Sequence, residues 1–355
     1  MEQNDKTRAL LLLHFQKYPQ MQIQDAFKYL YQSAFGCEHL LSSIDDATDY
    51  IKKEYNEIKK KGGISVESLD GEYSRVYLSC LGAGMSSETL AKIFCASAGA
   101  LSCGVAELEE KLSVLRELTE EKLLPFTSRE LDEAISKWRS DGYPAVHHSE
   151  KFRECYAPSY RVISNRFVPF LPLLAEIDKG LRAGRVKLAI EGGSASGKST
   201  LGNMLEELYG ATVFHMDDFF LRPEQRTRER YSEIGGNVDR ERFLCEVLSP
   251  LSKGEAINYR RFDCSLMTLA PAVRVEPKEL TVVEGAYSMH PELCGYYTLS
   301  VFLDVEGETQ KARIARRNSP EMAERFYNEW IPLEDRYFSG MRVRERCDLL
   351  IEICD

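Results

Sequence analysis

The feature that most constrains this chain is a glycine-rich segment in its second half. Residues 192–199 read Gly-Gly-Ser-Ala-Ser-Gly-Lys-Ser and match the pattern G-x-x-x-x-G-K-[ST] at every position. An apolar run at residues 186–190 precedes them, and a helical pattern at residues 198–209 follows. In such a strand–loop–helix unit, backbone N–H groups and the helix N-terminus bind phosphate groups. The alternative is a chance glycine-rich turn, which leaves the flanking strand and helix unexplained.

The residue types of this segment explain its chemistry. Glycines allow the turns that aim successive N–H groups at one point, Lys198 supplies a mobile charge for the β- and γ-phosphates, and the Ser199 hydroxyl can ligate Mg²⁺. We therefore expect ATP and Mg²⁺ as cofactors. The predicted nucleotide site consists of Gly192, Gly193, Ser194, Ala195, Ser196, Gly197, Lys198, Ser199 and Thr200. The motif alone fits a GTPase switch, a motor ATPase or a small-molecule kinase.

The two halves of the chain differ in hydrophobic pattern. From residue 185 onward, β-rich runs at 186–190, 212–215, 281–283, 299–303 and 349–353 alternate with helical stretches at 198–209, 240–248 and 308–317. This alternation predicts an α/β domain with a mainly parallel sheet flanked by helices. Up to about residue 180 the apolar residues recur at helical spacing, as at residues 107–122. A length of 355 residues then suggests two domains, a mostly α-helical one at 1–180 and the α/β domain at 181–355.

Carboxylates follow two of the expected strands. Asp217 and Asp218 come after the run at 212–215, and Glu284 comes after the run at 281–283. Ligands bind at the carboxyl ends of strands in open α/β sheets, where a carboxylate can accept a proton or help hold a metal ion. Asp217 is the better candidate base because it stands first after the strand. The alternatives are a solvated turn for the aspartates and a strand-terminating charge for Glu284.

In this order and spacing, the motifs resemble the uridine kinase / phosphoribulokinase / pantothenate kinase family of P-loop kinases. The resemblance covers roughly residues 184–355. It is carried by the phosphate loop, by Asp217-Asp218-Phe219-Phe220, by Asn237-Val238-Asp239 with Phe243, by Val282-Val283-Glu284-Gly285, and by Leu303-Asp304-Val305 followed by Arg313, Arg316 and Arg317.

The resemblance implies a role for each matching position. Asp217 would be the catalytic base at the acceptor hydroxyl, Asp239 would hold substrate hydroxyls, and Glu284 would lie with Ser199 near the metal. Arginines at i, i+3 and i+4 share one helical face and would close over the transferred phosphate, namely Arg313, Arg316 and Arg317. A helix N-cap is the alternative for Asp239, and a solvated helical face is the alternative for the arginines.

The segment that corresponds to the family's acceptor pocket contains Tyr259 and Arg261 as candidate substrate contacts. It lacks the histidine with which nucleoside kinases of this family read the base, so uridine or cytidine is not secured as the acceptor. Arg260 and Arg261 could meet an anionic substrate or be surface charge. We expect an ATP-dependent kinase that transfers the γ-phosphate to a hydroxyl of a nucleoside-like or other small metabolite.

Two other functions stay open. The chain could be an NTP-binding regulatory or sensor protein with the helical half as its effector. It could also be a bifunctional enzyme with a second site around His147 and His148, which precede Arg153, Tyr160 and Arg161 in a polar segment that could equally be structural packing. Cys37, Glu38 and His39 also offer ligand atoms, but adjacent residues do not make a tetrahedral metal site without partners elsewhere.

Charge and hydropathy limit the partners. With 46 Lys and Arg against 56 Asp and Glu, the net charge of -10 disfavours nucleic acid and anionic membranes. No stretch approaches the roughly 20 apolar residues that span a bilayer, and the start of the chain lacks a signal-peptide pattern. We expect a cytoplasmic protein whose partner is a small-molecule phosphate acceptor. One sequence does not settle the oligomeric state, and a homodimer is one option.

Overall fold

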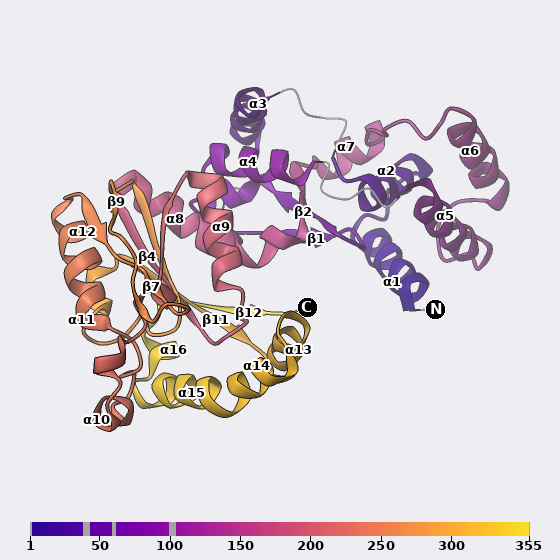
Figure 1. The fold of residues 1–355 in the computed structure, drawn as a ribbon. Helices are drawn as coiled ribbons and strands as arrows, with labels where there is room; N and C mark the ends of the chain where they lie inside the picture. Colours follow the sequence, from indigo (N-terminus) through magenta and orange to yellow (C-terminus); the bar gives the residue numbers. More distant parts are fainter. Residues whose placement is uncertain (1, 38–42, 59–61, 99–103, 355) are drawn as a thin grey trace. The chain divides into compact units, whose positions relative to one another are not determined.

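The computed structural model describes residues 2–37, 43–58, 62–98 and 104–354 (Figure 1). Glu38 and His39 lie outside these ranges, so the candidate ligand cluster next to Cys37 is not described. The chain divides into two compact units, Met1–Ala175 and Glu176–Asp355, which we call unit 1 and unit 2. The division falls inside helix α8 (Leu171–Ala183).

Unit 1 is mostly helical, as expected, and its helices pack around one apolar core. This core includes Leu30 of α2, Leu112 and Leu115 of α5, and Ile135 of α6, all at most 1% exposed. The helix predicted at residues 107–122 is α5. The helices are α1 (Glu2–Lys17), α2 (Ile23–Phe35), α3 (Ile44–Glu57), α4 (Ser87–Ser97), α5 (Gly104–Glu120), α6 (Ser128–Ser140) and α7 (Glu150–Tyr156), with 3₁₀ segments η2 (Leu78–Ala83) and η3 (Asn165–Phe170).

A small antiparallel sheet in unit 1 was not predicted. It has the order β1 (Val66–Ser68), β2 (Tyr73–Tyr77), β3 (Tyr160–Ser164). The central strand pairs with β1 across a short turn and with β3 across about ninety residues, in the register Tyr73↔Ser164. Strands of three to five residues give little local periodicity, and the pairing with β3 is set by packing between distant segments.

Unit 2 is built on a five-stranded parallel sheet, which confirms the predicted fold class. The strand order is β12 (Leu349–Ile353), β11 (Leu299–Val305), β4 (Val186–Gly192), β10 (Leu280–Glu284), β5 (Thr212–His215). All five strands coincide with predicted β-rich runs. The largest extensions are of two residues: β4 extends to Gly192, where its last two residues pair with Phe302 and Leu303 of β11, and β11 extends to Val305, where its last two residues pair with Glu352 and Ile353 of β12.

Helices cover both faces of this sheet (Figure 1). Helix α9 (Lys198–Tyr209) packs on β4, β5 and β10, and Phe338 of α15 contacts Phe302 of β11 with ring centroids 5.1 Å apart. The predicted helix at residues 240–248 is α11 (Arg240–Phe243) followed by a π-helical turn, η6 (Leu244–Leu248). Further helices are α10 (Arg228–Ser232), α12 (Ser249–Lys253), α13 (Gly307–Arg317), α14 (Pro320–Arg325), α15 (Ile331–Gly340) and α16 (Val343–Arg346), with a π-helical turn, η8 (Phe326–Trp330), between α14 and α15.

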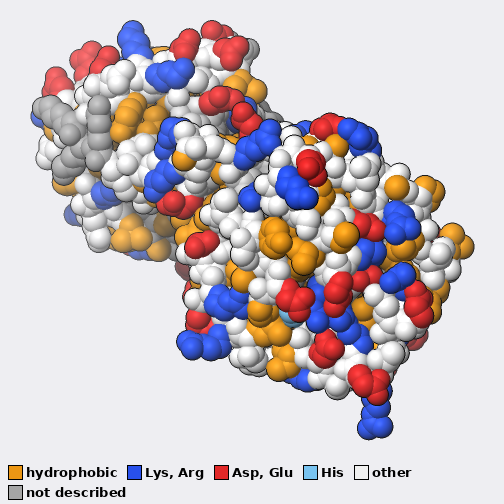
Figure 2. All heavy atoms as spheres, turned by 90° about the vertical axis from the view of Figure 1, so that its left-hand side faces the viewer, with side chains coloured by type: hydrophobic (Ala, Val, Ile, Leu, Met, Phe, Trp, Pro, Cys, Tyr) orange, Lys and Arg blue, Asp and Glu red, His pale blue; other side chains and the backbone are white. Residues whose placement is uncertain are grey.

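Two small antiparallel sheets complete unit 2. Two-stranded antiparallel pairs are formed by β6 (Ile257–Tyr259) with β9 (Val273–Val275) and by β7 (Phe262–Asp263) with β8 (Thr268–Leu269). Figure 2 shows acidic and basic side chains intermixed over the face that it displays. Throughout the described ranges, every helix is too short or too polar to cross a lipid bilayer.

Candidate active site

The glycine-rich segment forms a tight loop between β4 and α9 at the carboxyl edge of the sheet. Gly192 has φ 148°, and a Cβ there would lie 2.6 Å from the carbonyl oxygen of Leu303, so a side chain would collide with β11. Gly197 has φ 97° and is the N-cap of α9. The left-handed backbone at these two positions requires glycine and aims the first N–H groups of α9 into the loop.

Lys198 is the electrostatic centre of the loop. Its Nζ donates to the carbonyl oxygens of Gly192 at 2.9 Å and Gly193 at 2.8 Å. An ammonium group has three N–H donors, so one is left for a phosphate oxygen. The positive charge of Lys198 also lowers the pKa of the nearby carboxyls Glu191, Asp217 and Glu334, although burial outweighs it at all three.

The donor set of the loop fits a nucleotide. The Ser196 hydroxyl is buried, and it has no hydrogen-bond partner among the residues that the structure describes. A buried hydroxyl of this kind is costly unless a ligand oxygen meets it. Thr200 follows the loop in the first turn of α9 and is exposed.

The expected metal ligands lie together. Ser199 Oγ donates to Glu284 Oε1 at 3.0 Å, and Glu284 is 5% exposed at the end of β10. His215 Nδ1 contacts the same carboxylate oxygen at 2.5 Å, and this hydrogen bond raises the pKa of His215. Hydroxyl and carboxylate oxygens suit Mg²⁺, which commonly combines one or two carboxylates with substrate phosphates. In the described ranges, no group of three or more His, Cys, Asp or Glu side chains is arranged to hold a metal ion.

Asp217 borders a cavity of about 250 Å³ in unit 2. The cavity wall also contains Ser194 of the phosphate loop, so the candidate base and the phosphate site share one space. Desolvation by the surrounding protein raises the pKa of Asp217, the charge of Lys198 opposes this shift, and Glu284 adds to it. The rest of the wall is mainly apolar and aromatic: Met216, Phe220, Asn237, Val238, Ala286, Tyr287, Phe326, Trp330 and Glu334.

A fully buried carboxylate stands directly before the loop. Glu191 is 0% exposed, and its oxygens accept hydrogen bonds from the backbone N–H groups of Gly192 at 2.9 Å and Met289 at 3.0 Å. The Tyr337 hydroxyl of α15 donates to it at 3.1 Å. Burial raises the pKa of Glu191 to about 7. This network ties α15 to the end of β4.

A second buried carboxylate, Glu334 of α15, contacts the phosphate loop itself. Glu334 accepts hydrogen bonds from the backbone N–H of Ser194 at 2.8 Å and from its hydroxyl at 2.7 Å. Glu334 is 7% exposed, and burial raises its pKa. Since loop N–H groups are the donors that cradle phosphates, the carboxylate occupies a donor that a nucleotide would use.

Glu334→Gln should therefore tighten ATP binding about fivefold, because it removes a negative charge beside the phosphates that is worth about 1 kcal/mol or more. Isothermal titration calorimetry of both proteins measures the change in Kd. Asp335→Asn is the matched control, since Asp335 is the exposed neighbour on the same helix. Weaker ATP binding by Glu334→Gln would show instead that Glu334 holds the loop in its binding shape.

The predicted arginines separate into different environments on α13. Arg313 Nη1 donates to the carbonyl oxygen of Ala195 at 3.3 Å, so this arginine reaches the phosphate loop. The guanidinium of Arg317 lies over the ring of Phe326 at 5.3 Å, and Arg316 is exposed. Gln310, one turn before Arg313, donates to the carbonyl oxygen of Ser194 at 2.8 Å. Closure of Arg316 and Arg317 over a phosphate stays a prediction.

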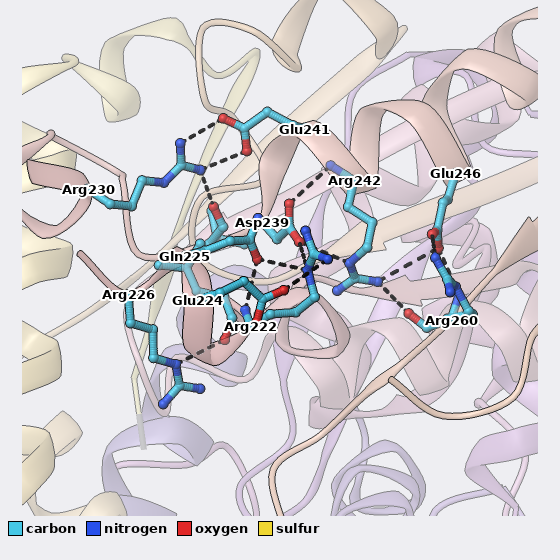
Figure 3. Close-up of polar contacts among 12 residues, drawn as sticks. Arg222, Glu224, Gln225, Arg226, Arg230, Asp239, Glu241, Arg242, Glu246 and Arg260 are labelled. Carbon is cyan, nitrogen blue, oxygen red and sulfur yellow. Dashed lines mark hydrogen bonds and ion pairs between the residues drawn. The ribbon is translucent and has the colours of Figure 1, made fainter. Parts of the chain in front are cut away.

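Asp239 acts as a helix cap, which is the alternative that its position before a helix suggested. Its Oδ1 accepts from the backbone N–H of Arg242 at 3.3 Å, and its Oδ2 accepts from Arg242 Nε at 3.2 Å (Figure 3). Arg222 Nε lies 3.7 Å from the same Oδ2. With Asp239 1% exposed and both of its oxygens engaged, its contact with substrate hydroxyls stays a prediction.

Tyr259 and Arg261 are not in the wall of the cavity that Asp217 borders, although Arg261 lies beside Asp218. The Tyr259 ring is 2% exposed and packs on Phe214 at 5.3 Å between ring centroids, so it belongs to the core. Arg261 Nη2 donates to the Tyr259 hydroxyl at 3.2 Å, and its Nε lies 3.4 Å from Asp218 Oδ2. Direct substrate contact by either residue stays a prediction.

Comparison with known proteins assigns a protein class to the part of the chain that contains the phosphate loop. The chain is 26% identical over 151 residues to a uridine kinase of Limosilactobacillus reuteri, a match that covers 39% of this chain and 66% of the relative. It is 28% identical over 150 residues to a uridine kinase of Clostridium novyi, covering 70% of that protein. A phosphoribulokinase of Synechocystis is 26% identical over 145 residues, 43% of its length. No family model matches the chain.

These matches confirm the expected likeness to uridine kinase and phosphoribulokinase. Over about 39% of its length the chain is homologous to P-loop kinases, the class that its loop and parallel sheet define. The chain spans just under two thirds of the L. reuteri relative. Among solved structures, a possible uridine kinase from Bacillus stearothermophilus aligns with 50% of this chain and 98% of its own, at 22% identity and a TM-score of 0.38.

Proposed function

We propose that the chain is an ATP-dependent kinase that phosphorylates a hydroxyl group of a small metabolite. The observation that carries this proposal is the shared cavity of unit 2, whose wall contains both Asp217 and the phosphate-loop residue Ser194. A hydroxyl compound in this cavity would lie between a candidate base and the γ-phosphate of a loop-bound nucleotide. Homology to kinases supports the same reaction class.

In the proposed reaction, Asp217 accepts the proton of the acceptor hydroxyl while the hydroxyl oxygen forms a bond to the γ-phosphorus. The bond from that phosphorus to the bridging oxygen breaks, and ADP leaves with its electron pair. Lys198 and Arg313 hold the phosphate oxygens and offset their charge. Ser199 and Glu284 would hold Mg²⁺, which supplies further charge compensation when bound.

The cavity wall suggests an acceptor with a ring or other apolar part. Phe220, Tyr287, Phe326 and Trp330 offer aromatic surface, and Asn237 offers an amide. We infer a nucleoside-like or comparably sized metabolite with at least one hydroxyl group. Mixed apolar walls with few polar groups are typical of small-molecule sites.

The test is an acceptor screen with nucleosides, pantothenate, sugar phosphates and glycerate, in which ADP release from ATP is measured with and without each compound. We expect ADP release that depends on the acceptor, together with a phosphorylated product seen by mass spectrometry. ATP hydrolysis at the same rate with every compound and with none would contradict the kinase proposal. That outcome would favour a regulatory NTP-binding protein.

A further inference from the structure

The wall of the cavity beside the phosphate loop carries charge of one sign. The cavity is small, about 250 Å³, so its wall residues border one shared space. Among the described residues that form this wall, the only side chains of the Asp, Glu, Lys, Arg or His type are two carboxylates, Asp217 and Glu334. Each lies close enough for the charge of Asp217 to raise the pKa of Glu334. The cavity therefore presents negative charge to an acceptor.

The basic side chains nearest to this cavity are engaged outside its wall. Lys198 Nζ donates to two carbonyl oxygens of the phosphate loop and would meet the phosphates of a nucleotide. Arg261 Nε lies 3.4 Å from Asp218, and Arg222 Nε lies 3.7 Å from Asp239 (Figure 3). Within the described part of the chain, neither of the two cavity carboxylates has an ion-pair partner.

Glu334 is held by hydrogen bonds for which a nucleotide would compete. Its carboxylate accepts from the backbone N–H of Ser194 at 2.8 Å and from the Ser194 hydroxyl at 2.7 Å. A phosphate that takes this N–H leaves a carboxylate that is only 7% exposed short of a donor beside the cavity. A desolvated carboxylate is costly without a charged or hydrogen-bonding partner. A cationic group on the acceptor would be such a partner.

The rest of the wall suits a cation as well. Four aromatic rings border the cavity, those of Phe220, Tyr287, Phe326 and Trp330. The rings of Phe326 and Trp330 meet edge to face at 4.4 Å between centroids. Arg317 and Arg325, which are both exposed, lie over these two rings at 5.3 Å and 5.1 Å, and each ring still borders the cavity. Aromatic faces attract cations and are used to recognise ammonium groups.

Tyr287 is fixed in this wall by an unusual backbone. Its φ is 75°, a conformation that a residue with a bulky side chain rarely adopts and that occurs mainly where the structure enforces it, as at ligand sites. The side chain is 7% exposed and is hydrogen-bonded to Asn237, and its ring lies 4.7 Å from that of Tyr337. Burial raises the pKa of Tyr287, and the charges of Glu334 and Asp217 add to this shift. Both carboxylates therefore act on the same aromatic wall.

We propose that the acceptor carries an ammonium group, which binds to Glu334 and the aromatic wall while a hydroxyl group of the same molecule lies at Asp217. The inference rests on the proposed kinase function and names its substrate class, a hydroxy-amine with an apolar part. The same wall disfavours an acceptor with a phosphate or carboxylate group, because two carboxylates repel it. Sugar phosphates, glycerate and pantothenate should accordingly be inactive in the acceptor screen.

Three probes of similar shape test the charge preference at pH 7. They are 2-amino-2-phenylethanol, 1-phenyl-1,2-ethanediol and mandelate, which share a phenyl ring and a hydroxyl group but carry an ammonium, a neutral and a carboxylate group. Calorimetry measures their binding to the full-length chain, alone and with Mg²⁺ and a non-hydrolysable ATP analogue. We expect the amine to bind about tenfold more tightly than the diol, and mandelate to bind more weakly than the diol. Equal binding of the amine and the diol would overturn the inference.

Glu334→Gln tests the assigned partner of the ammonium group. This variant keeps the size of the side chain and removes its charge, so the preference for the amine over the diol should fall to about threefold or less. Asp335→Asn, at the exposed neighbouring position of α15, is the matched control and should keep the full preference. An unchanged preference in Glu334→Gln would contradict the role of Glu334.

Phosphorylation of the same probes separates this inference from the kinase proposal. With ATP, we expect the amine to be phosphorylated faster than the diol, and mass spectrometry identifies each product. Equal phosphorylation of the amine and the diol would leave the kinase function standing and overturn the preference for an ammonium group. ADP release that no acceptor changes would overturn the kinase function itself, whereas the binding measurements would still report the ammonium site.

Discussion

Asp217→Asn should lower acceptor-dependent turnover by about 10²–10⁴-fold, the usual contribution of a positioned general base. The amide keeps the size of the side chain but no longer accepts the proton of the acceptor hydroxyl. ATP affinity should stay within a few-fold of wild type, since Asp217 lies in the cavity wall and the phosphates are held by the loop. Steady-state kinetics with the best acceptor and calorimetry with ATP measure the two effects separately.

Asp218→Asn is the matched control for this experiment. Asp218 is the neighbouring carboxylate, and its oxygen lies 3.4 Å from Arg261 Nε. We expect an effect of less than about tenfold, because an ion pair with a largely exposed arginine contributes little. A large loss in Asp218→Asn with near-normal activity in Asp217→Asn would exchange the roles of the two residues.

We also expect Asp217 to determine how kcat/KM falls at low pH. Desolvation raises the pKa of Asp217 above its usual value near 3.8, so the fraction of the reactive carboxylate falls as the pH drops through this raised pKa. In the wild type, kcat/KM should therefore rise with pH on the acid side. This limb should be missing from the residual activity of Asp217→Asn.

Lys198→Ala should reduce kcat/KM for ATP by about 10²–10³-fold or more, because it removes the charge that meets the transferred phosphate. The loss should appear both in the Kd for ATP and in kcat. Lys253→Ala on α12 is the matched control, since it removes an exposed lysine of unit 2. Unchanged ATP affinity in Lys198→Ala would contradict a role of this loop in nucleotide binding.

Lys198→Ala should also change the pKa values of the carboxyl groups in the site. Lys198 lowers the pKa of Glu191, Asp217 and Glu334, so its removal leaves these carboxyls with still higher pKa values. We expect the acid limb of the residual activity to move to higher pH than in the wild type. Thermal unfolding followed by circular dichroism checks that the fold is retained.

Most of unit 2 could be predicted from local patterns. Strands appear in the sequence as short runs of β-branched and apolar residues bounded by turns, and this is why even the edge strands β5 and β12 match the predicted residues 212–215 and 349–353. The phosphate loop was equally predictable, because its glycines are required by the local backbone at Gly192 and Gly197. Ser199 and Glu284 could be paired in advance because parallel strands end at the same edge of a sheet.

The partners of the loop could not be predicted in this way. Glu334 reaches Ser194 across 140 residues, and Tyr337 reaches Glu191 across 146 residues. A Glu directly before a glycine-rich loop was a visible signal for Glu191. Glu334, Tyr337 and Gln310 lie in ordinary amphipathic helices, where nothing in their immediate sequence marks them.

In unit 1, the helices could be predicted from the sequence, whereas the sheet could not. Its helices follow from the spacing of apolar residues along the chain, because one face of each helix must be buried. Its sheet depends on the pairing of β2 with β3, which are about ninety residues apart, and polar contacts such as Asp25 with His148 join segments 123 residues apart that meet only when the chain packs. Local backbone preference and hydrophobic periodicity thus account for the elements and for the phosphate loop. The surroundings of the loop arise from packing between distant segments that no local pattern encodes.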